Sequence, residues 1–358
     1  MIAVALGVTP LLILIKVFGE SSPPGADRAL LAYASTQDSV RLADGRTIHL
    51  VCMGQGSPVV ILTTGGGDWS IGWNKVQPAV ARTTRVCAWD RPGFGLSSPT
   101  SKPETADETT TDLQAALKAA GLAGPYVVVG ASLGGYESVL LADREPSEVV
   151  GMVLVDPAYP DQYAQFARVA PALADFWNPP PEPRLAACAE ALRAGTRPPD
   201  DLDPHECLHP RWPSRYPTEL RTALTDGPAE ATPQAIASSV QTLLAENTPA
   251  FLEADSKIAI KPGRNYGDMP LVVLTADDHQ PPPIAPYLSA AAKAEVPAFI
   301  AEWRRGHDAY AALSTRGVDR TVPDSTHDIP QSNPQAVVGA IDEVVDKARA
   351  SGSAKRAR

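Results

Sequence analysis

The sequence has few of the features that indicate metal, nucleotide or nucleic-acid chemistry. Its four cysteines include no C-x-x-C pair, so their spacing matches no zinc-binding pattern. Residues 65–67 are three glycines, but no Gly-Lys-Ser or Gly-Lys-Thr follows them, which excludes a P-loop. Acidic residues outnumber basic ones by 41 to 31 in 358 residues, and the net charge of −10 disfavours a nucleic-acid partner. We expect no metal and no organic cofactor.

The N-terminal residues 1–19 differ in composition from the rest of the chain. Residues 2–15 carry no charged side chain, a pattern typical of a membrane anchor or an export segment. The run lacks two features of a secretory signal peptide, because no basic stretch precedes it and no clean A-x-A site follows it. The alternative interpretation is a terminal helix that packs on the body of the protein. Residues 20–37 are expected to form a linker. We therefore expect an extracytoplasmic protein, either secreted or associated with a membrane through residues 1–18.

Four cysteines behind an export-like segment permit two disulfides in an oxidising compartment. The alternative is four free, buried thiols. The candidates are Cys52, Cys87, Cys188 and Cys207.

Strand and helix patterns alternate along the chain, which predicts an α/β sheet. The apolar runs 126–129 and 149–155 are typical of parallel strands covered on both faces. From residue 159 to 262 the pattern changes, and eleven prolines between Pro171 and Pro217 exclude regular sheet there. We expect a mostly helical cap at 159–262, inserted into a core of residues 38–158 and 263–348. Residues 349–358 are expected to form a basic, disordered tail.

The segment Gly130-Ala131-Ser132-Leu133-Gly134 has the form G-x-S-x-G. It lies between a predicted strand and a predicted helix, which is the context of a nucleophile elbow. The tight turn needs small flanking residues and exposes the serine hydroxyl at the carboxyl end of the sheet. We predict that Ser132 is a nucleophile.

A serine hydroxyl is a weak nucleophile and needs a base. His327 lies in a polar loop just before the final predicted helix, from which it could reach the sheet edge. We expect His49, in an edge hairpin, and His307, beside two arginines, to be at the surface. His205 and His209 flank Cys207 in the proline-rich segment, where surface positions are favoured over a metal site. His327 is the predicted base.

Three carboxylates could orient this base. Asp277 and Asp278 follow the predicted strand 271–275, and a carboxylate there gives the chain order Ser, Asp, His. Asp156 also ends a predicted strand. We favour Asp278 and keep Asp156 and Asp277 as alternatives.

Negative charge that develops during acyl transfer needs backbone donors. The N–H of Leu133, at the start of the predicted helix, is one candidate. The glycine run after the strand 59–62 offers a second, for which we favour Gly66. Each such donor contributes about 3 kcal/mol when it is aimed at the oxyanion.

Together these elements resemble the α/β-hydrolase superfamily over roughly residues 38–348. The motifs that carry the resemblance are Thr64-Gly65-Gly66, Asp90-Arg91-Pro92-Gly93-Phe94-Gly95-Leu96-Ser97, the Ser132 elbow, Leu154-Val155-Asp156-Pro157 and His327. Members usually have His-Gly where this chain has Thr64-Gly65. Members with a late acid often show Gly-x-x-Asp, whereas here Ala276 replaces the glycine and Asp278 comes one residue early. Some lipase-like members use an acid placed like Asp156, so this alternative stays open.

The resemblance implies a serine hydrolase with a mostly parallel central sheet, flanking helices and an inserted cap. A small-molecule carboxylic ester is the favoured substrate. Lactonase, thioesterase, peptidase, carbon–carbon hydrolase and cofactor-free peroxidase activities are alternatives, as is a non-catalytic surface binding module. The family's sheet order implies a Cys52–Cys87 bridge, and Cys188–Cys207 could staple the cap. Aromatic residues of the cap are candidate pocket walls, with simple packing as the alternative: Phe176, Trp177, Trp212 and Tyr216.

Overall fold

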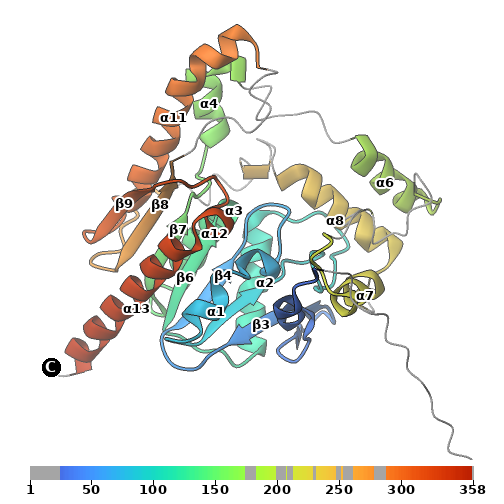
Figure 1. The fold of residues 1–358 in the computed structure, drawn as a ribbon, viewed down its shortest axis with the longest axis horizontal. Helices are drawn as coiled ribbons and strands as arrows, with labels where there is room; N and C mark the ends of the chain where they lie inside the picture. The colour runs from blue at the N-terminus through green and yellow to red at the C-terminus, as the bar shows by residue number, and fades with distance from the viewer. Residues whose placement is uncertain are drawn as a thin grey trace, which may run out of the picture.

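The computed structural model describes residues 25–173, 183–198, 207, 213–228, 231–246, 251–252, 261–277 and 288–356. A seven-stranded sheet runs through this part of the chain in the order β3-β5-β4-β6-β7-β8-β9 (Figure 1). Strand β3 pairs antiparallel with β5, and the remaining pairs are parallel. The strands are β3 (Leu50–Met53), β4 (Val59–Thr63), β5 (Val86–Trp89), β6 (Tyr126–Ala131), β7 (Val149–Val155), β8 (Leu271–Ala276) and β9 (Gly317–Val322). The mostly parallel α/β sheet predicted from the sequence is confirmed.

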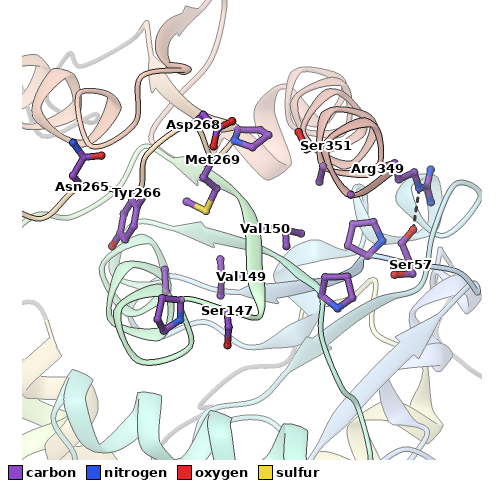
Figure 2. Close-up of a pocket in the computed structure, with 17 residues that line it drawn as sticks. Ser57, Ser147, Val149, Val150, Asn265, Tyr266, Asp268, Met269, Arg349 and Ser351 are labelled. Carbon is purple, nitrogen blue, oxygen red and sulfur yellow. Dashed lines mark hydrogen bonds between the residues drawn. The ribbon is translucent and has the colours of Figure 1, made fainter. Parts of the chain in front are cut away.

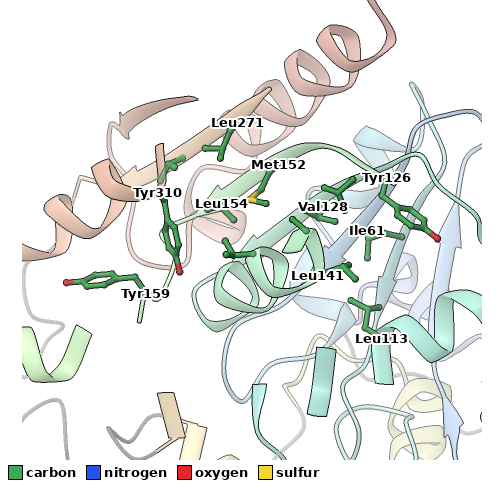
Figure 3. Packing of buried hydrophobic residues seen from close by; sticks show 14 of the residues in the cluster. Ile61, Leu113, Tyr126, Val128, Leu141, Met152, Leu154, Tyr159, Leu271 and Tyr310 are labelled. Carbon is green, nitrogen blue, oxygen red and sulfur yellow. The ribbon is translucent and has the colours of Figure 1, made fainter. Parts of the chain in front are cut away.

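Apolar side chains on both faces of the central strands explain why helices cover the sheet on both sides. On β6, Val128 packs into one buried cluster, whereas Val127 and Val129 pack into the other. Figure 3 shows the first cluster, where Val128 and Met152 lie near side chains from the covering helices. The helices on that side are α2 (Ala106–Ala119), α3 (Leu133–Arg144) and α11 (Ala290–Ala311). The other face is covered by η2 (Ser70–Trp73), α1 (Gln77–Val80), α12 (Ile329–Ser332) and α13 (Pro334–Arg356).

The described residues of the cap are mostly helical and contain no strand, in line with the expectation that this segment excludes regular sheet. Helices α6 (Pro183–Ala194) and α8 (Pro233–Glu246) pack on each other and share a small buried cluster. The cap also contributes α4 (Gln162–Val169), η3 (Pro171–Leu173) and α7 (Thr218–Asp226), and α4 packs on α11. In Figure 1, α6, α7 and α8 lie together on one side of the molecule, away from α4.

Both cysteine pairings occur as disulfides. Cys52 and Cys87 are directly opposite each other in the β3–β5 ladder. Cys188, on α6, is bonded to Cys207, and both side chains are buried in the cap. One disulfide therefore fixes the sheet edge and the other ties the cap to itself.

The prediction that residues 20–37 form a linker is wrong for the second half of this range. Residues Arg28–Ala34 form a 3-10 helix, η1, capped by the Asp27 side chain. Leu30 and Tyr33 are each 1% exposed and pack in a cluster with cap residues of α7, such as Leu220. The segment is ordered because it buries apolar side chains between the core and the cap. A hairpin of β1 (Val40–Arg41) and β2 (Thr47–Ile48) follows it.

The disordered tail predicted from residue 349 is also wrong, because α13 continues to Arg356. The Arg349 guanidinium donates to the carbonyl oxygens of Ser57 and Thr83, each at 2.9 Å. Figure 2 shows the first of these bonds. These contacts hold α13 against the loops that precede β4 and β5. The expected anchor at residues 1–19 lies outside the described residues, and among the helices that are described none is long and apolar enough to cross a bilayer.

His49, expected at the surface, is fully buried. Its Nδ1 lies 2.7 Å from Asp90 Oδ2, and its Nε2 lies 2.9 Å from the Ser35 carbonyl oxygen. Because both partners are acceptors, both ring nitrogens carry hydrogens and the imidazole is charged. Burial alone would lower the pKa of His49, but the charge and hydrogen bond of Asp90 outweigh it and raise the pKa above its ordinary value.

We expect this ion pair to make stability depend on pH. A raised pKa in the folded state contributes stability that is complete below about pH 6.5 and is lost as the pH rises through the folded value. His49→Gln leaves Asp90 buried without its partner and should lower the free energy of unfolding by about 3–5 kcal/mol at pH 6. Urea unfolding at pH 6 to 9 should show the gap between wild type and variant narrowing as pH rises. A gap that stays constant over this range would contradict a charged His49.

Candidate active site

The carboxyl ends of the parallel strands bring the predicted chemistry to one edge of the sheet. Ser132 lies between β6 and α3, as the N-cap residue of α3, with φ 50° and ψ −119°. Its flanking glycines are required sterically, since a Cβ on Gly130 would lie 2.0 Å from the Gly134 carbonyl oxygen. A Cβ on Gly134 would lie 2.4 Å from the Thr63 carbonyl oxygen. This strained turn is the geometry expected of a nucleophile elbow.

Three side chains at this edge form a continuous hydrogen-bonded chain. His327 Nε2 lies 3.0 Å from Ser132 Oγ, and His327 Nδ1 lies 2.6 Å from Asp156 Oδ2. The histidine comes from the loop between β9 and α12. Burial opposes protonation of His327, but the hydrogen bond and charge of Asp156 raise its pKa above the ordinary value. The arrangement can remove a proton from the serine hydroxyl and stabilise the resulting imidazolium.

The carboxylate that the described residues place at His327 is that of Asp156, one of the two alternatives to the favoured Asp278. Asp278 itself lies outside the described residues. Asp277 follows β8, and its backbone N–H donates to Ser325 Oγ at 3.2 Å. Asp156 is placed by the end of β7: its φ is 45°, and its backbone N–H donates to the Leu274 carbonyl oxygen at 2.7 Å. Neighbouring strands thus turn this carboxylate toward His327.

Two groups that the sequence did not single out hold the other oxygen of Asp156. The Ala276 backbone N–H donates to Oδ1 at 2.9 Å, and the Trp303 indole N–H donates to it at 3.2 Å. The Trp303 ring also contacts the His327 ring edge-on, with centroids 5.8 Å apart. Trp303 lies on α11, far along the chain, and no local pattern marks it as part of a site.

His307, expected in solvent, is fully buried behind Asp156. Its Nδ1 lies 2.6 Å from Thr275 Oγ1, and its Nε2 lies 3.0 Å from the Pro157 carbonyl oxygen. The same nitrogen Nδ1 is 3.9 Å from Asp156 Oδ1. The two neighbouring arginines suggested a surface position, but His307 lies on the buried face of α11. His205 and His209 lie outside the described residues.

The predicted oxyanion donors lie beside Ser132. Leu133 is the first residue of α3, so its N–H has no acceptor within the helix. A Cβ on Gly65 would lie 3.2 Å from Ser132 Cβ, which brings the loop before Gly66 against the nucleophile. The oxyanion role of the Gly66 and Leu133 amides stays a prediction.

The sequence matches the family described as alpha/beta hydrolase fold over residues 58–292. The chain belongs to the α/β-hydrolase family. Among curated relatives, an uncharacterized protein from Schizosaccharomyces pombe is 43% identical over 83 residues, which are 23% of this chain and 16% of that protein. A 2-hydroxy-6-oxononadienedioate/2-hydroxy-6-oxononatrienedioate hydrolase from Dechloromonas aromatica is 31% identical over 133 residues, 35% of this chain and 46% of that protein.

This α/β hydrolase spans less than half the length of these curated relatives. Among solved structures, it resembles the epoxide hydrolase CorEH with a TM-score of 0.52 and 17% identity, over 86% of this chain and 96% of that one. A likeness at this identity concerns the fold alone.

One of the predicted pocket residues of the α/β hydrolase lies in a packing position. Tyr216 is 5% exposed and contacts Trp69 edge-on, with ring centroids 6.3 Å apart. It belongs to the cluster that joins η1, α7 and the core, which is the packing alternative. Phe176, Trp177 and Trp212 lie outside the described residues.

A groove of about 830 Å³ lies at the opposite edge of the sheet (Figure 2). It is lined by residues that precede or begin the parallel strands, such as Ser57, Val149 and Met269, and by the end of α13. The triad lies at the carboxyl ends of the same strands, so this groove is not its substrate pocket. Across the described residues, no group of three or more His, Cys, Asp or Glu side chains is arranged to hold a metal ion.

Proposed function

We propose that the protein is a serine hydrolase that cleaves a small-molecule carboxylic ester through an acyl-enzyme intermediate. The hydrogen-bonded chain from Ser132 through His327 to Asp156 is the observation that carries the proposal. His327 takes the Ser132 proton as Oγ attacks the carbonyl carbon, and Asp156 stabilises the imidazolium without taking the proton itself.

The oxyanion formed in this step accepts hydrogen bonds from the N–H groups of Gly66 and Leu133. His327 then gives its proton to the leaving alcohol, so that the first product departs neutral. Water repeats the sequence on the acyl-enzyme: His327 takes a proton from water, the acid is released and Ser132 recovers its hydrogen.

The proposed location is extracytoplasmic. Two disulfides within the described residues support it, because such bonds persist in oxidising compartments. Association with a membrane would come from residues 1–18.

A second candidate is hydrolysis of a carbon–carbon bond. It is favoured by the 31% identity to the 2-hydroxy-6-oxononadienedioate/2-hydroxy-6-oxononatrienedioate hydrolase. Both candidate reactions use the same serine, base and acid. They differ only in the substrate.

Labelling with a fluorophosphonate probe tests the proposal directly. We expect one probe molecule per chain, attached to the peptide that contains Ser132, and no labelling of Ser132→Ala or of heat-unfolded protein. An unlabelled native protein would favour the non-catalytic binding module instead. A panel of p-nitrophenyl esters of increasing acyl length, lactones, aminoacyl esters and 2-hydroxy-6-oxononadienedioate then separates the two candidate substrates.

A further inference from the structure

A buried ion pair joins the cap to the loop that carries Gly66. Arg91, which follows β5, and Glu246, the last residue of α8, are 2% and 4% exposed. Arg91 Nη1 lies 2.7 Å from Glu246 Oε1, and Glu137 Oε1 of α3 lies 3.8 Å from the same nitrogen. Burial raises the pKa of Glu246 and the charge of Arg91 opposes this, so the carboxylate depends on Arg91 to stay ionised.

Both members of this pair also bind the glycine loop. Arg91 Nη2 donates to the Gly65 carbonyl oxygen at 2.7 Å, and Glu246 Oε2 accepts from the Gly67 N–H at 2.6 Å. The loop is therefore held by one hydrogen bond on each side of Gly66. Gly67 has φ 71°, a value that glycine adopts without strain.

The bond to the Gly65 carbonyl has a particular consequence for Gly66. The Gly65 carbonyl and the Gly66 N–H belong to the same planar peptide unit and point in opposite directions. Fixing the carbonyl against Arg91 thus fixes the direction of the N–H. A charged donor on the carbonyl also polarises the amide, which strengthens the hydrogen bond that its N–H donates.

We propose that Arg91 and Glu246 are positioning residues that aim the Gly66 N–H at the oxyanion. Because Glu246 belongs to the cap and Arg91 to the core, the donor is in place only when α8 is seated on the core. The cap then acts on the reaction step as well as on substrate binding. This inference rests on the proposed hydrolase function for its kinetic part, but its structural part can be measured without any substrate.

Two variants test the loop itself. Glu246→Leu removes the acceptor for Gly67, and the double variant Arg91→Met with Glu246→Leu removes both hydrogen bonds of the loop. The double variant is made in a Glu137→Gln background, because Glu137 is buried beside Arg91 and would otherwise keep an uncompensated charge. With no buried carboxylate left beside the replaced arginine, it should fold even if the single variant does not. Hydrogen exchange of the amides of residues 65–68 should accelerate by about tenfold or more in both. Unchanged exchange in this loop would overturn the proposal.

The kinetic part is measured per active site, after titration with the fluorophosphonate. Loss of one oxyanion donor costs about 10²–10³-fold in kcat. A misdirected donor should cost about 10–100-fold in kcat in the double variant, with KM within about threefold. Inhibition by a trifluoromethyl ketone, whose adduct carries an oxyanion, should weaken by the same factor as kcat/KM. Glu246→Gln keeps an oxygen acceptor for Gly67 and should recover most of the activity lost in Glu246→Leu.

Thr242→Val is the matched control. Thr242 lies one turn earlier on α8, and its Oγ1 accepts from the Glu104 backbone N–H at 3.0 Å, a cap–core bond that does not involve the glycine loop. This variant should leave kcat and loop exchange unchanged. An increase in KM at constant kcat in the Arg91 and Glu246 variants would show that the pair only shapes the pocket. If the wild type cleaves no ester but the amides of residues 65–68 exchange faster in the variants, the proposed function fails and the positioning of the loop by Arg91 and Glu246 stands.

Discussion

Replacing Ser132 by alanine should lower kcat for a p-nitrophenyl ester by about 10⁶-fold. The variant loses the attacking oxygen, whereas the elbow keeps its backbone hydrogen bonds, such as that from the Ser132 N–H to the Val155 carbonyl oxygen at 3.0 Å. Initial rates at saturating ester, with the variant at high concentration, give the ratio. Thermal unfolding should occur within a few degrees of the wild type.

Ser138→Ala is a suitable control for this variant. Ser138 lies on α3, the helix that follows Ser132, but its hydroxyl donates to the Gly134 carbonyl oxygen inside the helix. We expect near wild-type kcat from Ser138→Ala. Activity retained by Ser132→Ala would refute the acyl-enzyme route.

Asp156→Asn should lower kcat by about 10⁴-fold without disturbing the geometry. The Ala276 and Trp303 N–H groups both donate to Oδ1, so the amide oxygen of the asparagine must take that position. The amide NH₂ then faces His327 Nδ1 and donates to it. His327 consequently carries its hydrogen on Nε2, where it cannot accept the proton of Ser132.

The pH profile provides a second measurement on the same variant. His327 must be neutral to act as a base, and its raised pKa places the acidic limb of kcat/KM above pH 6.5 in the wild type. Because Asp156 causes this increase in the pKa of His327, the acidic limb of the residual kcat/KM should move to lower pH in Asp156→Asn. Asp277→Asn and Asp278→Asn are the controls. A 10⁴-fold loss in either of them, with Asp156→Asn active, would assign the acid to the loop after β8.

The serine and the histidine of the proposed triad could be picked out in the sequence because their signals are local. Ser132 is marked by five consecutive residues between a strand and a helix, and His327 by a polar loop before the final helix. The main strands were predicted for a similar reason, since runs such as 149–155 are apolar throughout. Each of these features depends on residues that are neighbours in the chain.

The acid and the buried histidines depend on contacts between distant residues. Asp156 and His327 are separated by 171 positions, and two strand ends offered a carboxylate. Which of the two strand ends, that of β7 or that of β8, supplies the acid depends on how far each strand extends beyond its neighbour. The burial of His49 depends in the same way on Asp90 and on the carbonyl of Ser35, which local polarity does not reveal.

The position of Asp156 separates the part of the chain that carries most of the proposed active site from the part that carries the cap. The glycine loop, the elbow and the acid all lie between residues 64 and 156, and the cap begins only afterwards. The long segment between the acid and His327 has to return the histidine to the same sheet edge, but its interior supplies no member of the proposed triad. Insertions or deletions in the cap that keep Glu246 in place can therefore change substrate range, while two adjacent strands, β6 and β7, preserve the distance between nucleophile and acid.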